Sequence, residues 1–479
     1  MGLQCPRLLW HAVNDSQALP EADASQQAIF DQGKEVGQLA KRMFPGAVDV
    51  CPDAPNFGQA LQVTTEATKS GKPLCEAAFA AAGGCCRVDI LAPCPGGEWE
   101  IVEVKSSTSV KDEQLDDVAF QTWVVRQAGV PVRRTRLLTI NNEFVRSGEI
   151  NPRKFFVDTD VTAEIAPLTG SVQKRLSSMQ AAIRLPKPPE MNIGPHCDDP
   201  YTCLLHDQCW SVLPDGNVLE LYHGKKKGFD LLSRGITRLT DIPKPQKLSV
   251  ARGIQKMVAS SGKPHINTKA LAAFLKRLRY PVHYLDFETF ATAIPFFDGA
   301  RPYQQVPFQF SLHVVRAPGA VPEHVMFLAE GRHDPRPEFM QCLRDAIGPT
   351  GSIVAYNTAF ELARLRECSD AMPQYSSWLK AVERRFVDLL KPFRNFAYYH
   401  PQQHGSASMK VVLPALTGKG YAHLAIQEGG TASLEFLRVT FGNVDEAERQ
   451  RVRRNLELYC GQDTEGMIWI MNSLNDLVR

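Results

Sequence analysis

Short apolar runs in the first half of the chain alternate with polar residues as strands do. Residues 87–91 and 100–104 each place charged side chains between apolar ones, a period of two that is typical of a half-buried strand. The segment 94–97 between them reads Cys-Pro-Gly-Gly, which favours a turn. The pattern therefore predicts two antiparallel strands joined as a hairpin.

The second half of the chain repeats this change between strand-like and helix-like stretches. Residues 282–285 and 353–357 are apolar runs that predict buried strands, and residues 459–469 have helical spacing. Residues 229–243 predict a short helical hairpin, and Pro243 and Pro245 mark a linker. Strands and helices that alternate in this way predict an α/β protein.

The length of the chain favours three parts. It has 479 residues, and domains have roughly 100–200 residues each. We expect an N-terminal domain over 1–215, a helical connector over 216–275, which is richer in Pro, Gly and Lys, and a C-terminal domain over 276–479.

Composition adds expectations about the compartment and the partners. With 44% hydrophobic and 22% charged residues the chain is ordinary for a globular protein, and a net charge of +2 does not by itself indicate a nucleic-acid partner. No run of eighteen apolar residues and no signal-peptide core occurs, so we expect a cytoplasmic protein without a membrane partner. Its twelve cysteines should then be thiols or metal ligands rather than disulfides.

Four acidic residues and a tyrosine form the candidate site of the C-terminal domain. Asp286 and Glu288 lie two apart on a predicted strand, so both point to one face. Glu361 falls at a predicted helix start, and Tyr459 and Asp463 share one helix face. Four carboxylates can hold two Mg²⁺ or Mn²⁺ ions, the arrangement that supports phosphodiester hydrolysis, and the phenol could orient the attacking water. Solvated acids at a strand end are the alternative interpretation.

The order of these residues resembles the DEDD 3′–5′ exonuclease superfamily. Residues 286–288 match its Asp-x-Glu motif, residues 357–361 its Asn-x-x-Phe-acid motif, and residues 459–463 its Tyr-x-x-x-Asp motif, which is the tyrosine branch. The resemblance implies an RNase H-like mixed sheet flanked by helices. The family usually has aspartate where Glu361 stands, so this side chain is longer by one methylene. Residues 406–410, Ser-Ala-Ser-Met-Lys, could contact a phosphate, and an ordinary helix start is the alternative.

A second acidic site is predicted on the N-terminal hairpin. Glu103 and Lys105 lie on one strand face, and the antiparallel neighbour could bring Asp89 beside them. The two acids would hold a metal ion, and the ammonium could position water or stabilise phosphate charge. Charges that fall by chance on two amphipathic strands are the alternative.

These residues resemble the PD-(D/E)XK nuclease superfamily, in particular its RecB-like branch. The resemblance implies a restriction-endonuclease-like core and gives Gln121 the place of the glutamine that the branch carries on a later helix. Gly37 stands where the branch often has a histidine ligand, and Glu35 or Glu76 could replace it.

Four cysteines form a candidate ligand set at the two ends of the N-terminal domain. Cys197, Cys203 and Cys209 are spaced six apart, and Cys5 lies near the start of the chain. Four thiolates are the usual ligands of a 4Fe–4S cluster. RecB-like nucleases with such a cluster carry one cysteine before the core and three after it, which these positions resemble. Structural Zn²⁺ and free thiols are the alternatives.

The sequence as a whole predicts a metal-dependent nuclease with two sites, and it resembles bacterial proteins that join the two nuclease types. We expect DNA with single-stranded ends as the substrate, trimmed 3′–5′ at the C-terminal site. One alternative is an RNase that uses the same DEDD site. The other is a nucleic-acid-binding scaffold with an iron–sulfur cluster and degenerate sites.

Overall fold

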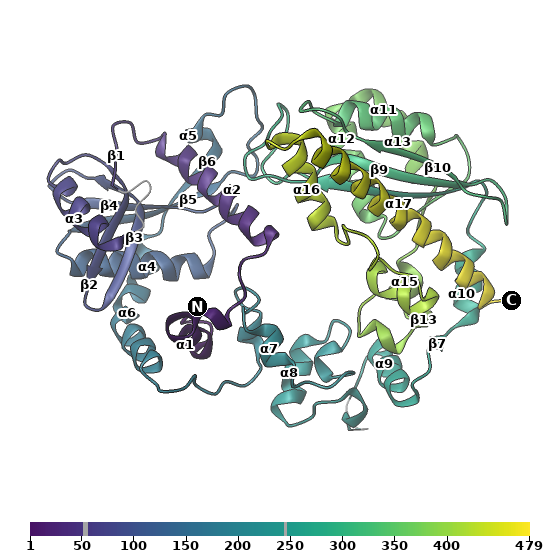
Figure 1. Cartoon of the computed structure of the whole chain (residues 1–479), viewed down its shortest axis with the longest axis horizontal. Helices are drawn as coiled ribbons and strands as arrows, with labels where there is room; N and C mark the ends of the chain where they lie inside the picture. Colours follow the sequence, from purple (N-terminus) through teal and green to yellow (C-terminus); the bar gives the residue numbers. More distant parts are fainter. Residues whose placement is uncertain (51–55, 244–246) are drawn as a thin grey trace. The chain divides into compact units, whose positions relative to one another are not determined.

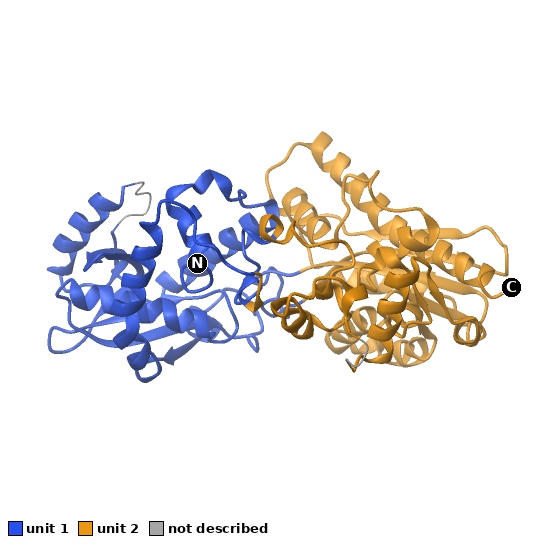
Figure 2. Ribbon diagram, turned by 90° about the horizontal axis from the view of Figure 1, so that it is seen from below, with its two compact units in different colours: residues 1–192, 196–206, 291–304 blue, residues 193–195, 207–290, 305–479 orange. Residues whose placement is uncertain are grey.

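The computed structural model describes residues 1–50, 56–243 and 247–479, which divide into two compact units (Figure 2). The first unit contains residues 1–192, 196–206 and 291–304, and the second contains 193–195, 207–290 and 305–479. The predicted connector is part of the second unit, whereas residues 291–304 of the predicted C-terminal domain belong to the first. Of the predicted linker, residues 244 and 245 lie outside the described residues.

A six-stranded sheet forms the centre of the first unit, with its strands in sequence order. The predicted hairpin is confirmed, because β3 and β4 pair antiparallel across a turn in which Gly96 and Gly97 have positive φ. The parallel pair β4–β5 is connected through helix α4. The strands are β1 Val48–Asp49, β2 Leu74–Ala81, β3 Gly84–Pro93, β4 Trp99–Val104, β5 Val132–Ile140 and β6 Phe156–Asp160.

Helices cover both faces of this sheet (Figure 1). Neighbouring residues on a strand point to opposite faces, and on β4 Ile101 packs with Val124 of α4, whereas Val102 packs with Val36 of α2. The helices of this unit are α1 Pro6–Asn14, η1 Ser16–Ala18, α2 Ala24–Lys41, α3 Phe57–Thr68, α4 Asp112–Gln127, α5 Pro152–Phe155 and α6 Thr162–Ile183; η2 Pro195–Cys197 and α7 His206–Trp210 lie where the chain passes between the units.

A five-stranded mixed sheet in the order β10-β9-β8-β11-β12 forms the centre of the second unit. Strands β10, β9 and β8 are antiparallel, and β11 and β12 continue parallel to β8. A sheet flanked by helices is confirmed here too: Phe287 of β8 packs on Phe339 of α11, and its neighbour Asp286 contacts Cys460 of α17 on the opposite face. The strands are β8 Val282–Phe290, β9 Val306–Val315, β10 Glu323–Leu328, β11 Ser352–Ala355 and β12 Phe386–Asp388.

The predicted helical hairpin at 229–243 forms only in part. Helix α8 ends before Gly235, which has a φ of 78°, and the second helix is a single 3₁₀ turn, η4, because Pro243 follows it closely and cannot continue a helix. The remaining elements are η3 Val218–Glu220, α8 Lys225–Ser233, η4 Leu239–Asp241, α9 Val250–Ser261, β7 His265–Ile266, α10 Thr268–Leu275, α11 Arg336–Ala346, α12 Ala359–Ala371, η5 Pro373–Tyr375, α13 Ser376–Glu383, α14 Lys391–Arg394, β13 Tyr398–Tyr399, η6 Pro401–Gln403, α15 Met409–Thr417, α16 Gly429–Phe441 and α17 Glu446–Asp476.

Among the described residues, no helix is both long and apolar enough to cross a membrane.

Candidate metal centre and second acidic site

The four acids predicted for the C-terminal domain line one cavity of about 640 Å³. Asp286 and Glu288 come from β8, Glu361 from the first turn of α12, and Asp463 from the middle of α17. Glu288, Glu361 and Asp463 expose 6%, 2% and 4% of their surface. The structure therefore brings together, at a buried position, carboxylates that lie far apart in the sequence.

The turn between β11 and α12 places Glu361 in this cavity. Asn357 in that turn has a φ of 78°, a conformation that asparagine tolerates better than most residues. Asp388, at the end of β12, accepts hydrogen bonds from the amides of Asn357 (3.1 Å) and Leu390 (3.0 Å). Asp388 thus holds the turn through its Oδ1, and the helix that follows begins with its first-turn carboxylate directed into the cavity.

Burial and mutual repulsion make these carboxylates poor anions in the absence of a cation. Burial, followed by the charges of Asp463 and Glu288, raises the pKa of Asp286 well above its ordinary value. Burial raises the pKa of Glu288 to about 8, and that of Glu361 to about 8. A divalent cation among the four groups would remove this electrostatic cost.

One lysine is built into the cluster. The Lys410 ammonium donates a hydrogen bond to the hydroxyl of Tyr459 (2.9 Å) and lies 3.7 Å from Oδ1 of Asp463. It also stands over the rings of Tyr421 (3.6 Å) and Tyr459 (4.2 Å). The Tyr421 hydroxyl donates to Oδ1 of Asp463 (2.5 Å). A single ammonium lies among four carboxylates, so it can balance the charge of only one of them.

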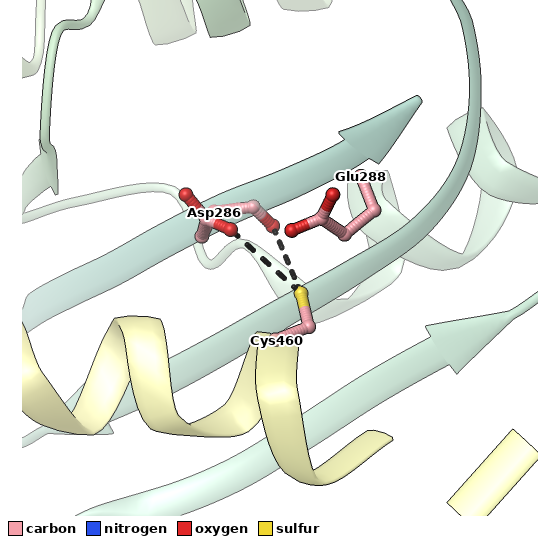
Figure 3. Close-up of side chains that lie close together, drawn as sticks. All are labelled: Asp286, Glu288 and Cys460. Atoms are coloured by element: carbon pink, nitrogen blue, oxygen red, sulfur yellow. Dashed lines mark hydrogen bonds between the residues drawn. The ribbon is translucent and has the colours of Figure 1, made fainter. Parts of the chain in front are cut away.

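Cys460 lies beneath the first acidic motif (Figure 3). Its sulfur and the carboxylate oxygens of Asp286 and Glu288 all lie within 4.8 Å of one another, and its thiol donates to Oδ2 of Asp286 (3.8 Å). Burial raises the pKa of this thiol well above its ordinary value, which keeps it protonated as a donor. Cys460 lies inside the Tyr-x-x-x-Asp motif, but its contact with β8 could not be predicted from that motif.

The residues of this cavity fit hard divalent cations. Oε2 of Glu361 is buried and has no hydrogen-bond partner in the described part of the chain, as expected for an atom that would ligate an ion. Asp286, Glu288, Glu361 and Asp463 offer only oxygen atoms, which Mg²⁺ and Mn²⁺ prefer.

The predicted N-terminal site also assembles. The amide of Val104 donates to Oδ2 of Asp89 (2.8 Å), and the Lys105 ammonium donates to Glu103 (2.8 Å) and to Asp117 (2.6 Å). Burial, then the charge of Glu103, raises the pKa of Asp89 well above its ordinary value. Burial also raises the pKa of Glu103. Although burial opposes it, the charges of Glu103 and Asp117 raise the pKa of Lys105.

Helix α4 supplies two further polar groups to this site. Nε2 of Gln121 donates to Asp117 (3.4 Å), and Oε1 of Gln121 and Oε2 of Glu103 are buried without a hydrogen-bond partner in the described part of the chain. Asp117 was missed in the sequence analysis, although its position four residues before Gln121 on a predicted helix was a usable signal.

The two replacements considered for the absent histidine have different surroundings. Glu35 is exposed on α2, the helix that also carries Gly37. Glu76 on β2 lies close enough to Asp89 to raise the pKa of that carboxyl, and it forms an ion pair with Lys41 (3.3 Å). Glu76 therefore is the acid that belongs to this neighbourhood.

Three of the four predicted cysteine ligands lie in one region of the first unit. Cys5, Cys197 and Cys203 are buried. Gln4, beside Cys5, donates to the carbonyls of His196 (3.0 Å) and Tyr201 (2.6 Å), so the start of the chain packs on the segment that carries the other two. Cys209 lies on α7, within the second unit.

Comparisons with known proteins give limited matches. Residues 283–408 match a domain family described as a domain of unknown function, DUF2779. The chain is 26% identical to "Uncharacterized protein MG366 homolog" of Mycoplasma pneumoniae over 222 residues, which are 42% of this chain and 33% of that protein. It is 26% identical to "Uncharacterized protein MG366" of Mycoplasma genitalium over 217 residues, 41% of this chain and 32% of that protein. The chain thus spans about a third of the length of these relatives. No solved structure matches it.

Proposed function

We propose that this protein is a metal-dependent nuclease that hydrolyses phosphodiester bonds at single-stranded ends of DNA, in the 3′–5′ direction at the C-terminal site. The observation that supports it is the convergence of Asp286, Glu288, Glu361 and Asp463 in one cavity together with a tyrosine and a lysine. A cluster with so many carboxylates and a single ammonium is suited to two cations, which phosphodiester hydrolysis uses.

The residues have distinct roles in this proposal. The four carboxylates would hold two Mg²⁺ or Mn²⁺ ions, which when bound supply positive charge for the attacking and leaving oxygens of the phosphodiester. The Tyr459 hydroxyl, which lines the same cavity and accepts a hydrogen bond from Lys410, orients the attacking water. Lys410 attracts the phosphate, and Tyr421 keeps the Asp463 carboxylate in place through its hydrogen bond.

The fold of the second unit supports an RNase H-like DEDD nuclease of the tyrosine branch. Three antiparallel strands followed by two parallel ones, with acids on the central strand, agree with the mixed sheet that the resemblance implies. The match to the domain family, residues 283–408, includes the first two motifs and ends before the third.

The second proposed nuclease site is the one formed by Asp89, Glu103, Lys105 and Gln121, on a PD-(D/E)XK core of the RecB-like type. Asp89 and Glu103 would hold a metal ion, and Lys105, already fixed by two acids, would face the phosphate charge. Asp117 orients this lysine.

Digestion of end-labelled oligonucleotides tests both sites. Matched single-stranded DNA and RNA oligomers are incubated with Mn²⁺ and wild-type protein, Asp286→Asn or Glu103→Gln. We expect DNA to be shortened from its 3′ end, and Asp286→Asn to stop the shortening. Degradation of RNA alone would make the protein an RNase. No degradation of either oligomer, with binding retained, would contradict the nuclease proposal and favour a scaffold.

A 4Fe–4S cluster held by Cys5, Cys197, Cys203 and Cys209 completes the proposal, since the buried thiols of the first three gather where the start of the chain packs. Protein purified without oxygen should contain iron and sulfide and absorb visible light. Cys203→Ser should lose the iron, and Cys85→Ser, which changes an exposed thiol, should keep it. Zinc in place of iron would contradict the cluster.

A further inference from the structure

The catalytic cavity extends beyond the acids to residues that hydrolysis does not use. Its lining includes Tyr222 and His223, from the segment between η3 and α8, and Arg394, Ser406 and Ser408. A volume of about 640 Å³ is within the range of roughly 300–1,000 Å³ found for cavities that hold drug-sized ligands. The cavity therefore has room for more of a substrate than the phosphate at the acids.

The Tyr222–His223 turn is held rigidly by helix α9. The amide of Tyr222 donates to Oε1 of Gln255 (2.7 Å), a side chain that is 1% exposed. The guanidinium of Arg252 donates to the carbonyls of Tyr222 (3.1 Å) and His223 (2.6 Å). His223 has a φ of 46°, a conformation that costs free energy and needs such support.

This turn presents two aromatic rings to the cavity. The ring of Tyr222 packs edge-on against that of Phe396, with 5.0 Å between centroids, and against His223, with 4.2 Å. Phe396 thereby holds the ring of Tyr222 in place, whereas His223 is exposed at the surface. Exposed rings beside a phosphate-binding cavity are the groups on which proteins stack unpaired bases.

Cationic and hydroxyl groups lie on the neighbouring wall. Arg394 lines the cavity and, in the described part of the chain, forms no ion pair. Ser408 stands at the N-cap of α15 without a side-chain capping bond. The Tyr356 hydroxyl donates to the carbonyl of Ala407 (2.6 Å) and so fixes this segment against the cavity. These groups suit a phosphate, with the guanidinium as its principal partner.

We propose that Tyr222, His223 and Arg394 form a subsite for a second nucleotide of a single strand, next to the nucleotide whose phosphate lies at the acids. The base stacks on the His223–Tyr222 rings, and its phosphate pairs with Arg394. A base must leave its helical stack to reach these rings, so the subsite selects single strands over duplexes. This inference rests on the proposed function and assigns the segment before α8 to substrate binding.

Two substrates separate this subsite from the chemistry at the acids. Thymidine 5′-(p-nitrophenyl phosphate) has a phosphodiester but no second nucleotide, whereas a short oligothymidylate has both. For His223→Asn, which keeps a residue that tolerates positive φ, and for Arg394→Gln, kcat/KM for the oligomer should fall about tenfold more than for the ester, as expected when ~1.4 kcal/mol of stacking or pairing is lost. Arg277→Gln, an exposed arginine outside the cavity, should leave this ratio at its wild-type value.

Binding gives a readout that does not depend on hydrolysis. The Kd of fluorescein-labelled oligothymidylate, measured by anisotropy in Ca²⁺, should rise about tenfold in both variants and stay unchanged for duplex DNA of the same length. Equal losses of kcat/KM on the oligomer and on the ester, with an unchanged Kd, would contradict the subsite but not the proposed nuclease activity. A wild type that hydrolyses neither substrate, but whose Kd rises in the variants, would overturn the nuclease and keep the subsite.

Discussion

The two acidic sites of this protein differ in how many of their charges are balanced by the protein itself. In the first unit, Lys105 is shared by Glu103 and Asp117, and Lys41 is shared by Glu76 and Asp49. In the second unit, four carboxylates have one ammonium, that of Lys410. The acids look alike in the sequence, but two ammonium groups are paired with acids of the first site and only one lies among the four acids of the second.

This difference shows that the function of two acids on a strand cannot be inferred until the cations around them are known. A buried carboxylate must be paired, protonated or bound to a metal ion. Glu103 is paired with Lys105 in the structure. Glu288 and Glu361, whose pKa values are both about 8, can hold a proton or bind a metal ion. We therefore expect the second unit to depend more strongly on added metal.

The largest effect should follow removal of a carboxylate from the four-acid cluster of the second unit. Asp463→Asn should lower kcat for DNA by about 10³-fold, equal to ~4 kcal/mol of transition-state stabilisation, because the two-ion arrangement loses a charged ligand. Initial rates with saturating Mn²⁺ measure it. The control is Glu465→Gln, which changes an exposed acid two residues later on the same helix and should retain the rate. Equal rates in Asp463→Asn and wild type would remove the second unit from catalysis.

The next largest effect is expected on the stability of the metal-free protein when each of the two lysines is replaced. Lys105→Met should destabilise the fold by about 2 kcal/mol, since it leaves Glu103 buried without its donor. Lys410→Met should cost less at neutral pH, because burial lowers the pKa of Lys410 and its acidic neighbours can hold protons instead. Urea unfolding in EDTA measures both. A larger loss in Lys410→Met would reverse the comparison between the sites.

Some features of the two sites could be predicted from the sequence. The hairpin of β3 and β4 was predicted correctly because alternation and a Gly-Gly turn are local signals. The placing of Tyr459 and Asp463 on one helix followed from their spacing. Asp117 could have been found from its spacing to Gln121.

Other features depend on contacts between distant segments. Tyr421 precedes α16 in a stretch without a periodic pattern, and its bond to Asp463 exists only because the loop packs beside α17. The role of Tyr222 in the cavity wall likewise depends on α9, through Gln255. No short motif encodes either contact, since each joins residues more than thirty positions apart.

The stability of the second unit should also depend on pH. Glu288 and Glu361 have ordinary pKa values of 4.5, raised to about 8 in the folded, metal-free protein. The folded state then binds more protons than the unfolded state between these values, so stability is full below pH 4.5 and falls as pH rises towards 8. The slope is at most ~1.4 kcal/mol per pH unit for each carboxyl.

Urea unfolding at several pH values measures this slope, once in EDTA and once in Mn²⁺. Bound cations keep the carboxylates ionised, so the fall in EDTA should be reduced or absent in Mn²⁺. The Glu288→Gln variant should have a flatter profile in EDTA than the wild type, whereas Glu465→Gln should follow the wild type. Stability that rises with pH over this window in EDTA would contradict the raised pKa values.

The smallest effect concerns the Tyr421 hydroxyl, which contacts the acidic cluster through Asp463. Tyr421→Phe removes the hydroxyl that donates to Oδ1 of Asp463 and keeps the ring beneath Lys410, so the loss should be near that of one hydrogen bond, about 1 kcal/mol or fivefold in rate. A positioning role requires that the Mn²⁺ concentration for half-maximal rate rise, because a less restrained carboxylate holds its ion less well. Tyr375→Phe, which removes a hydroxyl from the same unit away from the cavity, should change neither quantity. If Tyr421→Phe lowers the melting temperature but leaves the Mn²⁺ dependence as it was, the hydroxyl only stabilises the fold, and the second cluster relies on its carboxylates alone.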